Sequence, residues 1–402
     1  MVVGAGLAGL ACARALSATG APVLLLEGGD AVGGRMRTDR VAGFAIDRGF
    51  QVLNTGYPEL RRAVDLDAVD LRYLPRGVQV RRDGRLEDLP HPLSAPSAPW
   101  RALTSGATGL GQKIALARYA APLVLGSAAS VKRRRDVPAR EAWSELPPEV
   151  VDRLLVPFLT GVVLEREITT SRVFTDLMMR MFALGSSAVP ALGMQRVPES
   201  MAAALPPGVL RLEAPVASVQ ADGVTLQDGT SIAASAVVVA ADPWTAARLV
   251  PGLGAPPEPR SVTTHYFAAP AWRGQSGTLV VDADGSPVAN SVILTASAPE
   301  YSSDGRSLIA TSVVTTGRTE PVDPAVVLAT ARAMHEAPAG EWEPVAVREI
   351  PHALPAMTAP HPMRRPARVD GVYVAGDHRD TSSIQGALVS GRRVARAVLT
   401  DR

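Results

Sequence analysis

The chain contains a single cysteine and only two lysines among its 402 residues. One cysteine, Cys12, excludes an intrachain disulfide, a CxxC redox pair and a cysteine-rich metal site, and it is typical of an intracellular protein. The positive charge comes almost entirely from arginine, because Lys113 and Lys132 are the only lysines. The net charge of +2 is too small for a nucleic-acid-binding surface. We therefore expect a cytoplasmic protein without a nucleic-acid partner.

Long apolar runs are also absent. No uncharged stretch approaches the roughly 18 consecutive apolar residues of a membrane-spanning helix. The chain reaches Gly4 directly after Met1-Val2-Val3, so we expect no targeting segment before the fold begins. The shortness of this first strand leaves open a native start upstream of Met1. The hydrophobic fraction of 47% and the charged fraction of 20% are ordinary for a globular chain of two or three domains or lobes.

The signatures of hydrolase and metal sites are missing as well. Neither a GxSxG nor an HExxH motif occurs, so a hydrolase has no support. The histidines show no metal-ligand spacing, and we expect no metal site; they are His91, His265, His335, His352, His361 and His378.

The first motif that is present is GAGLAG, at residues 4–9. A short strand precedes it, a helical pattern follows over 10–19, and an apolar strand at 23–26 ends at Glu27. The three glycines allow a tight turn, a close approach of the backbone to a pyrophosphate, and close packing of helix on strand. The helix N-terminus offers free N–H groups to phosphates, and the acid would take the ribose hydroxyls. The pattern predicts dinucleotide binding, with a glycine-rich turn of no function as the alternative.

The remaining chain divides into a helical and a strand-rich region. From 53 to 150 the pattern is helical and irregular, with a proline-rich loop at 89–100 and a helix at 111–131 broken at Pro122. Helices continue through 147–182. Two Asp-Gly turns within 216–243 predict a hairpin or meander that ends in a buried strand. Later elements are strands at 261–267, 278–281, 291–295, 307–315 and 372–375, and helices at 324–336 and 384–399.

A second glycine pair follows the acid in EGGDAVGGRMRT, residues 27–38. Together with GFAIDRG (43–49) and the tail GVYVAGDHRDTSSIQGALVSGRRVARAVL (371–399), this series resembles the flavin amine oxidase and phytoene desaturase superfamily. The resemblance covers almost the whole chain. Weaker segments at 157–164, 193–205 and 237–243 occur in the superfamily's order.

The resemblance implies FAD as the cofactor. FAD is longer than NAD, which explains a second set of contacts: Gly33-Gly34 would let the main chain pass close, and Arg35 would grip the pyrophosphate. In the related flavoproteins the tail Gly-Asp step, Gly376-Asp377 here, meets the ribityl hydroxyls, and the helix from Ile384 points at the flavin. The alternatives are a solvated Arg35 and an Asp377 that caps the following helix. The predicted cofactor-binding residues are Gly4, Gly6, Leu7, Ala8, Gly9, Glu27, Gly28, Gly33, Gly34, Arg35, Gly49, Phe50, Gln51, Val216, Gly376, Asp377, Ser383, Ile384 and Ala387. Within this set, the resemblance places Val216 at the adenine and Gly49-Phe50-Gln51 along the flavin.

The fold implied is α/β, with a Rossmann-like FAD-binding domain of the glutathione-reductase or p-hydroxybenzoate-hydroxylase type and a second, mixed α+β substrate domain. We expect a discontinuous FAD-binding domain formed by 1–72, 197–250 and 352–402. The substrate domain would comprise 73–196 and 251–351. Cys12 lies in the first helix, away from the flavin ring, so we expect FAD to be held non-covalently.

The reaction implied is the removal of two electrons, as a hydride to flavin, from a largely apolar small molecule, with oxygen or another acceptor taking the electrons. The tail segment DHRDTSSIQ (377–385) contains no Trp or Tyr, and neither lysine lies where the amine oxidases place theirs. The tail therefore resembles the desaturase and squalene-processing branch more closely. The alternatives are an amine oxidase with an altered aromatic cage, a redox-neutral isomerase on reduced FAD, and a flavoprotein without enzymatic activity.

Two further predictions concern single features. His378 is the only histidine that the motif places near the flavin ring, where it would move a proton or pack behind the site. The basic run VKRRR (131–135) follows an apolar stretch, so residues 123–135 are a candidate for peripheral membrane contact, with an exposed charged helix end as the alternative.

Overall fold

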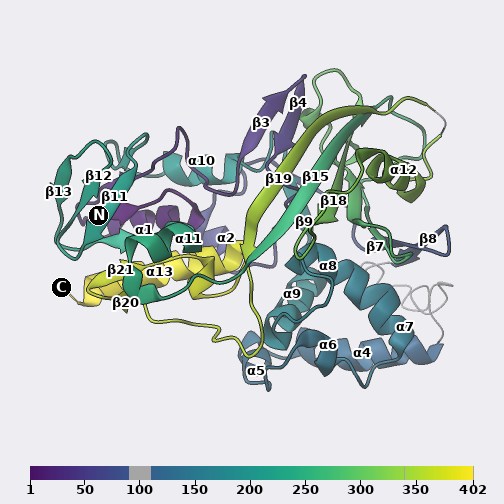
Figure 1. Ribbon diagram of the computed structural model, residues 1–402, viewed down its shortest axis with the longest axis horizontal. Coiled ribbons are helices and arrows are strands. Elements are labelled where there is room, and N and C mark those ends of the chain that lie inside the picture. The colour runs from purple at the N-terminus through teal and green to yellow at the C-terminus, as the bar shows by residue number, and fades with distance from the viewer. Residues whose placement is uncertain (90–109, 339, 402) are drawn as a thin grey trace.

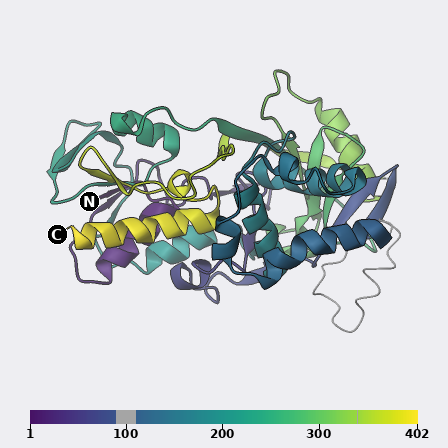
Figure 2. The same cartoon turned by 90° about the horizontal axis from the view of Figure 1, so that it is seen from below.

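The computed structural model describes residues 1–89, 110–338 and 340–401, and it shows two lobes side by side (Figure 1). One lobe contains both chain termini and a mostly parallel sheet. The other contains a larger, mostly antiparallel sheet and a group of helices packed below it (Figures 1 and 2). The predicted combination of a Rossmann-like domain and a mixed domain is confirmed.

The first lobe is built on a six-stranded sheet in the order β10-β2-β1-β14-β21-β20. All neighbours are parallel except β20, which pairs antiparallel with β21. The strands come from all three segments that we expect to form the FAD-binding domain. They are β1 (Val2–Val3), β2 (Leu25–Leu26), β10 (Leu210–Arg211), β14 (Val238–Val239), β20 (Arg368–Val369) and β21 (Val372–Val374).

Helix α1 (Leu7–Ser17) and the last helix, α13 (Ile384–Thr400), pack against each other on this sheet (Figure 2). Gly391 makes their close contact possible, because a Cβ at that position would lie 2.1 Å from the carbonyl oxygen of Ala8. The two ends of the chain are thereby joined in one layer. Helix α10 (Arg196–Ala203) also contacts α1.

The predicted meander is confirmed as β11 (Val216–Gln220), β12 (Gly223–Leu226) and β13 (Ser231–Ala233). It is followed by β14 and by helix α11 (Pro243–Leu249), whose N-terminus is capped by the Asp242 side chain.

The second lobe contains a seven-stranded sheet in the order β19-β15-β18-β17-β16-β7-β8. Helix α12 (Pro324–Met334) packs against four of its strands. Helix α8 (Val156–Val163) contacts β16, β17 and β18. The strands are β7 (Val78–Arg82), β8 (Arg85–Leu89), β15 (Pro259–Ala269), β16 (Leu279–Asp282), β17 (Val288–Ile293), β18 (Ser307–Val314) and β19 (Glu343–Pro355).

Smaller elements link the lobes. The hairpin of β3 (Thr38–Val41) and β4 (Phe44–Asp47) is followed by a small sheet in the order β5-β9-β6. Its strands are β5 (Leu53–Asn54), β6 (Leu71–Tyr73) and β9 (Ser187–Pro190). The other helices are α2 (Leu60–Ala63), α4 (Leu110–Leu125), α5 (Ala128–Lys132), α6 (Ala139–Ala142), α7 (Pro148–Val150), a π-helical turn (Val151–Leu155) and α9 (Arg172–Leu184).

The structure corrects the expectation for residues 53–150. The region contains the four strands β5 to β8, and a tight turn at Asp83-Gly84 joins β7 to β8. The helix expected at 111–131 ends at Leu125 and keeps Pro122 within it, and α5 is separate. β19 has no counterpart in the sequence-based expectation, and it runs across residue 352, where we expected a domain boundary. Of the proline-rich loop expected at 89–100, residues 90–100 lie outside the described part of the chain.

Asp47, at the end of β4, joins the two lobes through its hydrogen bonds. Its Oδ1 accepts from the Thr38 hydroxyl (2.6 Å) and the Met194 N–H (2.9 Å), and its Oδ2 accepts from the Tyr301 hydroxyl (2.9 Å). The Tyr266 hydroxyl donates to its backbone oxygen (2.8 Å). Asp47 is 2% exposed. Its buried carboxyl group therefore links the β3–β4 hairpin, the loop that contains Met194, and the second lobe through hydrogen bonds.

We expect Asp47 to make stability depend on pH. Burial raises the pKa of Asp47 from 3.8 to about 6, against the opposing effect of its hydrogen bonds. A carboxyl group with a raised pKa binds more protons in the folded chain than in the unfolded chain. Its contribution is therefore fully present below about pH 4 and is lost as the pH rises through about 6. The loss from this group is at most about 3 kcal/mol.

The variant Asp47→Asn cannot ionise, so the fall in its free energy of unfolding from pH 4 to 7 should be smaller than in the wild type. Urea unfolding of both proteins across this pH range measures the difference. Parallel stability profiles would show that Asp47 does not titrate as described.

Candidate functional site

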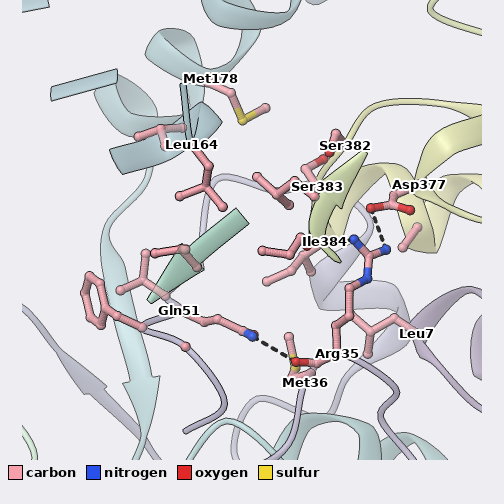
Figure 3. Close-up of a pocket in the computed structure, with 18 of the residues that line it drawn as sticks. Leu7, Arg35, Met36, Gln51, Leu164, Met178, Asp377, Ser382, Ser383 and Ile384 are labelled. Atoms are coloured by element: carbon pink, nitrogen blue, oxygen red, sulfur yellow. Dashed lines mark hydrogen bonds and ion pairs between the residues drawn. The ribbon is translucent and has the colours of Figure 1, made fainter. Parts of the chain in front are cut away.

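A cavity of about 1620 Å³ extends from the carboxyl edge of the six-stranded sheet to the helices of the second lobe. Its walls come from both lobes. Figure 3 shows the part where Arg35, Gln51, Asp377 and Ile384 face one another across the space.

The first glycine motif forms one end of this cavity. Gly6 precedes α1 in an extended conformation, and no side chain caps the helix N-terminus. A Cβ on Gly6 would meet no atom within 4 Å, so it would project into open space at the start of the helix. Gly9 is different, since its Cβ would lie 1.8 Å from the Gly4 carbonyl oxygen. The structure thus separates a glycine that leaves room for a ligand from one that packs helix on strand, as a dinucleotide cradle requires.

Glu27 directly follows β2 and lines the cavity. Its Oε2 accepts a hydrogen bond from the Ala5 N–H (2.7 Å), and its Oε1 accepts one from the Gly29 N–H (2.9 Å). The carboxylate is fixed by two backbone donors at the position where the motif predicts a ribose contact.

The second glycine pair lies directly against the first turn. Gly6 and Gly33 form a parallel β-bridge, in which the Gly33 N–H donates to the Ala5 carbonyl oxygen (2.9 Å). Gly33 has a φ of +121°, and its Cβ would lie 2.3 Å from the Met36 carbonyl oxygen, so a side chain is excluded there. Gly34 also has a positive φ, of +59°. The two motifs therefore form one continuous backbone surface along the cavity.

Arg35 connects three segments around the cavity (Figure 3). Its Nη2 lies 2.7 Å from the Asp377 Oδ2, and its Nη1 donates to the Ala353 carbonyl oxygen (2.9 Å). The Gln51 amide donates to the Arg35 backbone oxygen (2.9 Å). Arg35 is not a freely solvated side chain: the structure pairs two residues that the sequence separates by more than three hundred positions.

The tail supplies a second helix N-terminus. The Ser383 hydroxyl caps α13 by accepting from the Gly386 N–H (3.0 Å), so the alternative that Asp377 caps this helix is wrong. Asp377 is 4% exposed, and both residues line the cavity together with Ile384.

His378 does not line the cavity. Its side chain is 7% exposed and its ring lies against Gly376, whose Cβ would be 2.4 Å from the ring Cε1. Burial lowers the pKa of His378 to about 4, so the ring is neutral near pH 7. Neither ring nitrogen has a hydrogen-bond partner among the residues that the structure describes. A part for His378 in proton movement stays a prediction.

The structure brings the other predicted site residues together. All of the predicted cofactor-binding residues except Gly9 line the cavity: Gly4, Gly6, Leu7, Ala8, Glu27, Gly28, Gly33, Gly34, Arg35, Gly49, Phe50, Gln51, Val216, Gly376, Asp377, Ser383, Ile384 and Ala387.

The sequence analysis did not predict some of the residues that line the cavity. Trp244 and His352 stack with their ring centroids 4.1 Å apart and planes 14° apart, and both line the cavity. The Asp242-Pro243 step could have marked the start of α11, since Asp is a preferred N-cap and Pro a preferred first helical residue. That helix start would have placed Trp244 after the sheet edge. Nothing in the sequence indicated its stacking partner.

The far part of the cavity is apolar. It is lined from α4, the π-helical turn, α8 and α9, and none of the residues described there is charged. The side chains include Leu116, Val124, Leu155, Phe158, Phe174, Met178, Met179 and Phe182. No lysine is among the described lining residues.

No cluster of three or more His, Cys, Asp or Glu side chains with the arrangement of a metal site occurs within 1–89, 110–338 and 340–401. In the same part of the chain, no helix has the length and apolar character needed to cross a membrane.

Known proteins show the same fold. A protein from Exiguobacterium sp. 255-15, described as a protoporphyrinogen oxidase, superposes with a TM-score of 0.73 at 18% identity over 100% of this chain and 98% of that one. Cyclohexylamine oxidase from Brevibacterium oxydans IH-35A gives a TM-score of 0.73 at 19% identity over 100% and 98% of the chains. At these identities the likeness shows the fold.

Sequence comparison identifies the family. A Mycobacterium tuberculosis protein described as the flavin-containing monoamine oxidase AofH is 59% identical over 49 residues. That match covers 12% of this chain and 11% of the relative's length. The family model for flavin containing amine oxidoreductases matches residues 7–399. The chain therefore belongs to the flavin containing amine oxidoreductase family.

Proposed function

We propose that this enzyme removes two electrons from a largely apolar small molecule, in the manner of a desaturase or dehydrogenase, and passes them to oxygen or another acceptor. The observation that carries the proposal is the apolar far part of the cavity, where α4, α8 and α9 supply uncharged side chains. Bound FAD supplies the two-electron acceptor for this reaction. The protein contributes orientation and exclusion of water.

The glycine cradle supports binding of the cofactor at the opposite end. Gly6 and the uncapped N-terminus of α1 would hold the pyrophosphate, with Arg35 beside them, and Glu27 would hold a ribose. Asp377 would accept hydrogen bonds from the ribityl chain. The buried thiol of Cys12, whose pKa burial raises to about 12, lies outside the cavity lining and supports non-covalent attachment.

Amine oxidation is the second candidate, because the name of the family refers to amines and a protein of the same fold is named cyclohexylamine oxidase. An amine substrate carries a charged nitrogen, which is costly to bury without a compensating group. A substrate-library screen, scored by bleaching of the flavin absorption in the absence of air, distinguishes the two. Bleaching by simple amines would favour the second candidate.

A membrane surface is a plausible source of an apolar substrate, and residues 123–135 support such a contact. Leu125 at the end of α4 is 86% exposed, and Lys132 and Arg133 are exposed at the C-terminal end of α5. Val124 of the same helix lines the cavity. Binding to anionic vesicles that is lost in the variant Leu125→Ser/Arg133→Ser would support this contact.

The two glycines of the first motif should respond differently to substitution. Gly6→Ala fits the backbone conformation and meets no neighbour, so the apoprotein should stay as stable as the wild type while its affinity for FAD falls. Gly9→Ala drives its methyl group into the Gly4 carbonyl and should destabilise the fold itself. FAD titration and thermal unfolding of both apoproteins measure this. If Gly6→Ala binds FAD as tightly as the wild type, the cofactor does not occupy the space beside Gly6.

Arg35→Ala should weaken FAD binding by about 1.5–3 kcal/mol, or roughly ten- to a hundredfold, because a charge-assisted contact is lost and Asp377 is left unpaired. Arg35→Lys should recover part of the loss, since a point charge cannot reproduce the guanidinium fork. Arg37→Ala is the matched control, because Arg37 pairs with the exposed Asp30 and does not line the cavity. Equal FAD affinities of the two alanine variants would contradict the assignment.

Flavin reduction by the substrate found in the screen should depend only weakly on pH between about 6 and 9. An apolar C–H donor has no proton to lose first, whereas an ammonium group must lose one. His378 does not titrate in this range, since burial lowers its pKa to about 4. His378→Ala should lower the rate by less than the roughly 10²-fold expected of an essential acid or base. Anaerobic stopped-flow absorption measures the rate, and a steep rise with pH would favour the amine oxidase.

A further inference from the structure

A row of three polar residues crosses the floor of the apolar part of the cavity. Thr264 on β15 pairs in register with Ser312 on β18, which pairs with Asn290 on β17. All three are buried, with exposures of 0%, 4% and 5%. Ser312 and Asn290 line the cavity, while two positions further along β15 and β18 the lining residues are Val262 and Val314. Polar side chains in this row therefore interrupt an otherwise apolar surface.

The row begins beside the predicted flavin-lining segment. The Phe50 N–H donates to the Thr264 hydroxyl (3.4 Å), and the Thr264 and Ser312 hydroxyls lie 3.4 Å apart. Both contacts are long for hydrogen bonds, and the second is the contact that involves Ser312, so the hydrogen-bonding capacity of the Ser312 hydroxyl is largely unused. The row ends at Asn290.

Asn290 is the unsatisfied member of the row. Its Oδ1 has no hydrogen-bond partner within the described part of the chain and is closed to the cavity in this conformation, so the amide must rotate to present it to a ligand. On the opposite wall, α8 presents Gly161, whose Cβ would lie 2.2 Å from the Asn290 Nδ2. Only a glycine leaves room for the amide at this place. The helix and the strand are thus shaped around a polar group that they do not themselves satisfy.

Burying an amide without a partner is unfavourable, and such groups in native structures are matched by a ligand or by water. We propose that Asn290, with Ser312 beside it, binds the one neutral hydrogen-bonding group, a hydroxyl or carbonyl, of an otherwise apolar substrate. This inference rests on the proposed function and narrows its substrate class. An amide carries no charge, so it matches a neutral polar group that can accept or donate, and it offers nothing to balance a buried ammonium group.

The test uses the FAD-loaded enzyme and two probes of equal size, 1-octanol and nonane, which compete with Nile red for the cavity. The measured quantity is the ratio of the nonane Kd to the 1-octanol Kd. Asn290→Leu should lower this ratio about tenfold relative to the wild type, the effect of one hydrogen bond. Nonane itself should bind the variant at least as tightly.

Two further variants keep the test decisive. Ser291→Ala, next on the same strand, removes a hydroxyl that bonds Thr311 and His335 (2.9 Å each) and does not line the cavity, so the ratio should not change. Gly161→Ala displaces the amide and should lower the ratio without changing Asn290 itself. If Asn290→Leu does not fold, the ratio measured for Gly161→Ala tests the inference in its place.

The outcomes separate this inference from the function on which it rests. A ratio that is the same in the wild type, Asn290→Leu and Gly161→Ala would overturn the inference while apolar binding stands. If neither probe displaces Nile red, or the dye does not enter the cavity, the proposed apolar substrate falls and the inference falls with it.

Discussion

The site depends on one constraint, which is that four parallel strands end at the same edge of one sheet. The residues that follow β1, β2 and β14 are Gly4, Glu27 and Ala240, and Gly376 lies two residues after the end of β21; all four line the cavity. In open sheets of this kind, ligands bind outside the carboxyl ends of the strands, because the connecting turns there are free to be shaped for binding. The strands are only two or three residues long, yet their pairing brings three distant chain segments to one place.

The local parts of this arrangement could be predicted from the sequence. Both glycine motifs and the tail step at Gly376 act through their own backbone conformation, which short sequence patterns encode. Gly33 shows this, since its positive φ and the nearby Met36 carbonyl leave no place for another residue. The predicted set therefore lines the cavity almost completely.

What the sequence did not indicate depends on pairing across long distances. The stack of Trp244 on His352 and the contact of Asn290 with Gly161 join residues more than one hundred positions apart. No local periodicity distinguishes such residues from ordinary core positions. β7 and β8 were missed for a similar reason: their arginine-rich pattern reads as irregular, and they are strands because β7 extends the sheet beside β16. β19 was missed although its thirteen residues pair along most of β15.

The cavity combines two environments, and at its glycine-lined end two of the charged side chains are already matched. Arg35 pairs with Asp377, and Glu27 accepts two backbone hydrogen bonds. Neither Arg35 nor Glu27 is left with unbalanced charge to attract a phosphate, whereas Arg248 of α11, which also lines the cavity, has no ion-pair partner within the described part of the chain. We propose that the N–H groups and the positive dipole end of α1, which no side chain caps, also attract the phosphate. We expect affinity for the cofactor to depend on the main-chain path through Gly6 and Gly33 as well as on Arg35. At the other end of the cavity, α4, α8 and α9 present no charged side chain among the residues described there, so we propose that a substrate is selected by its apolar surface and by a neutral polar group that it brings to the sheet.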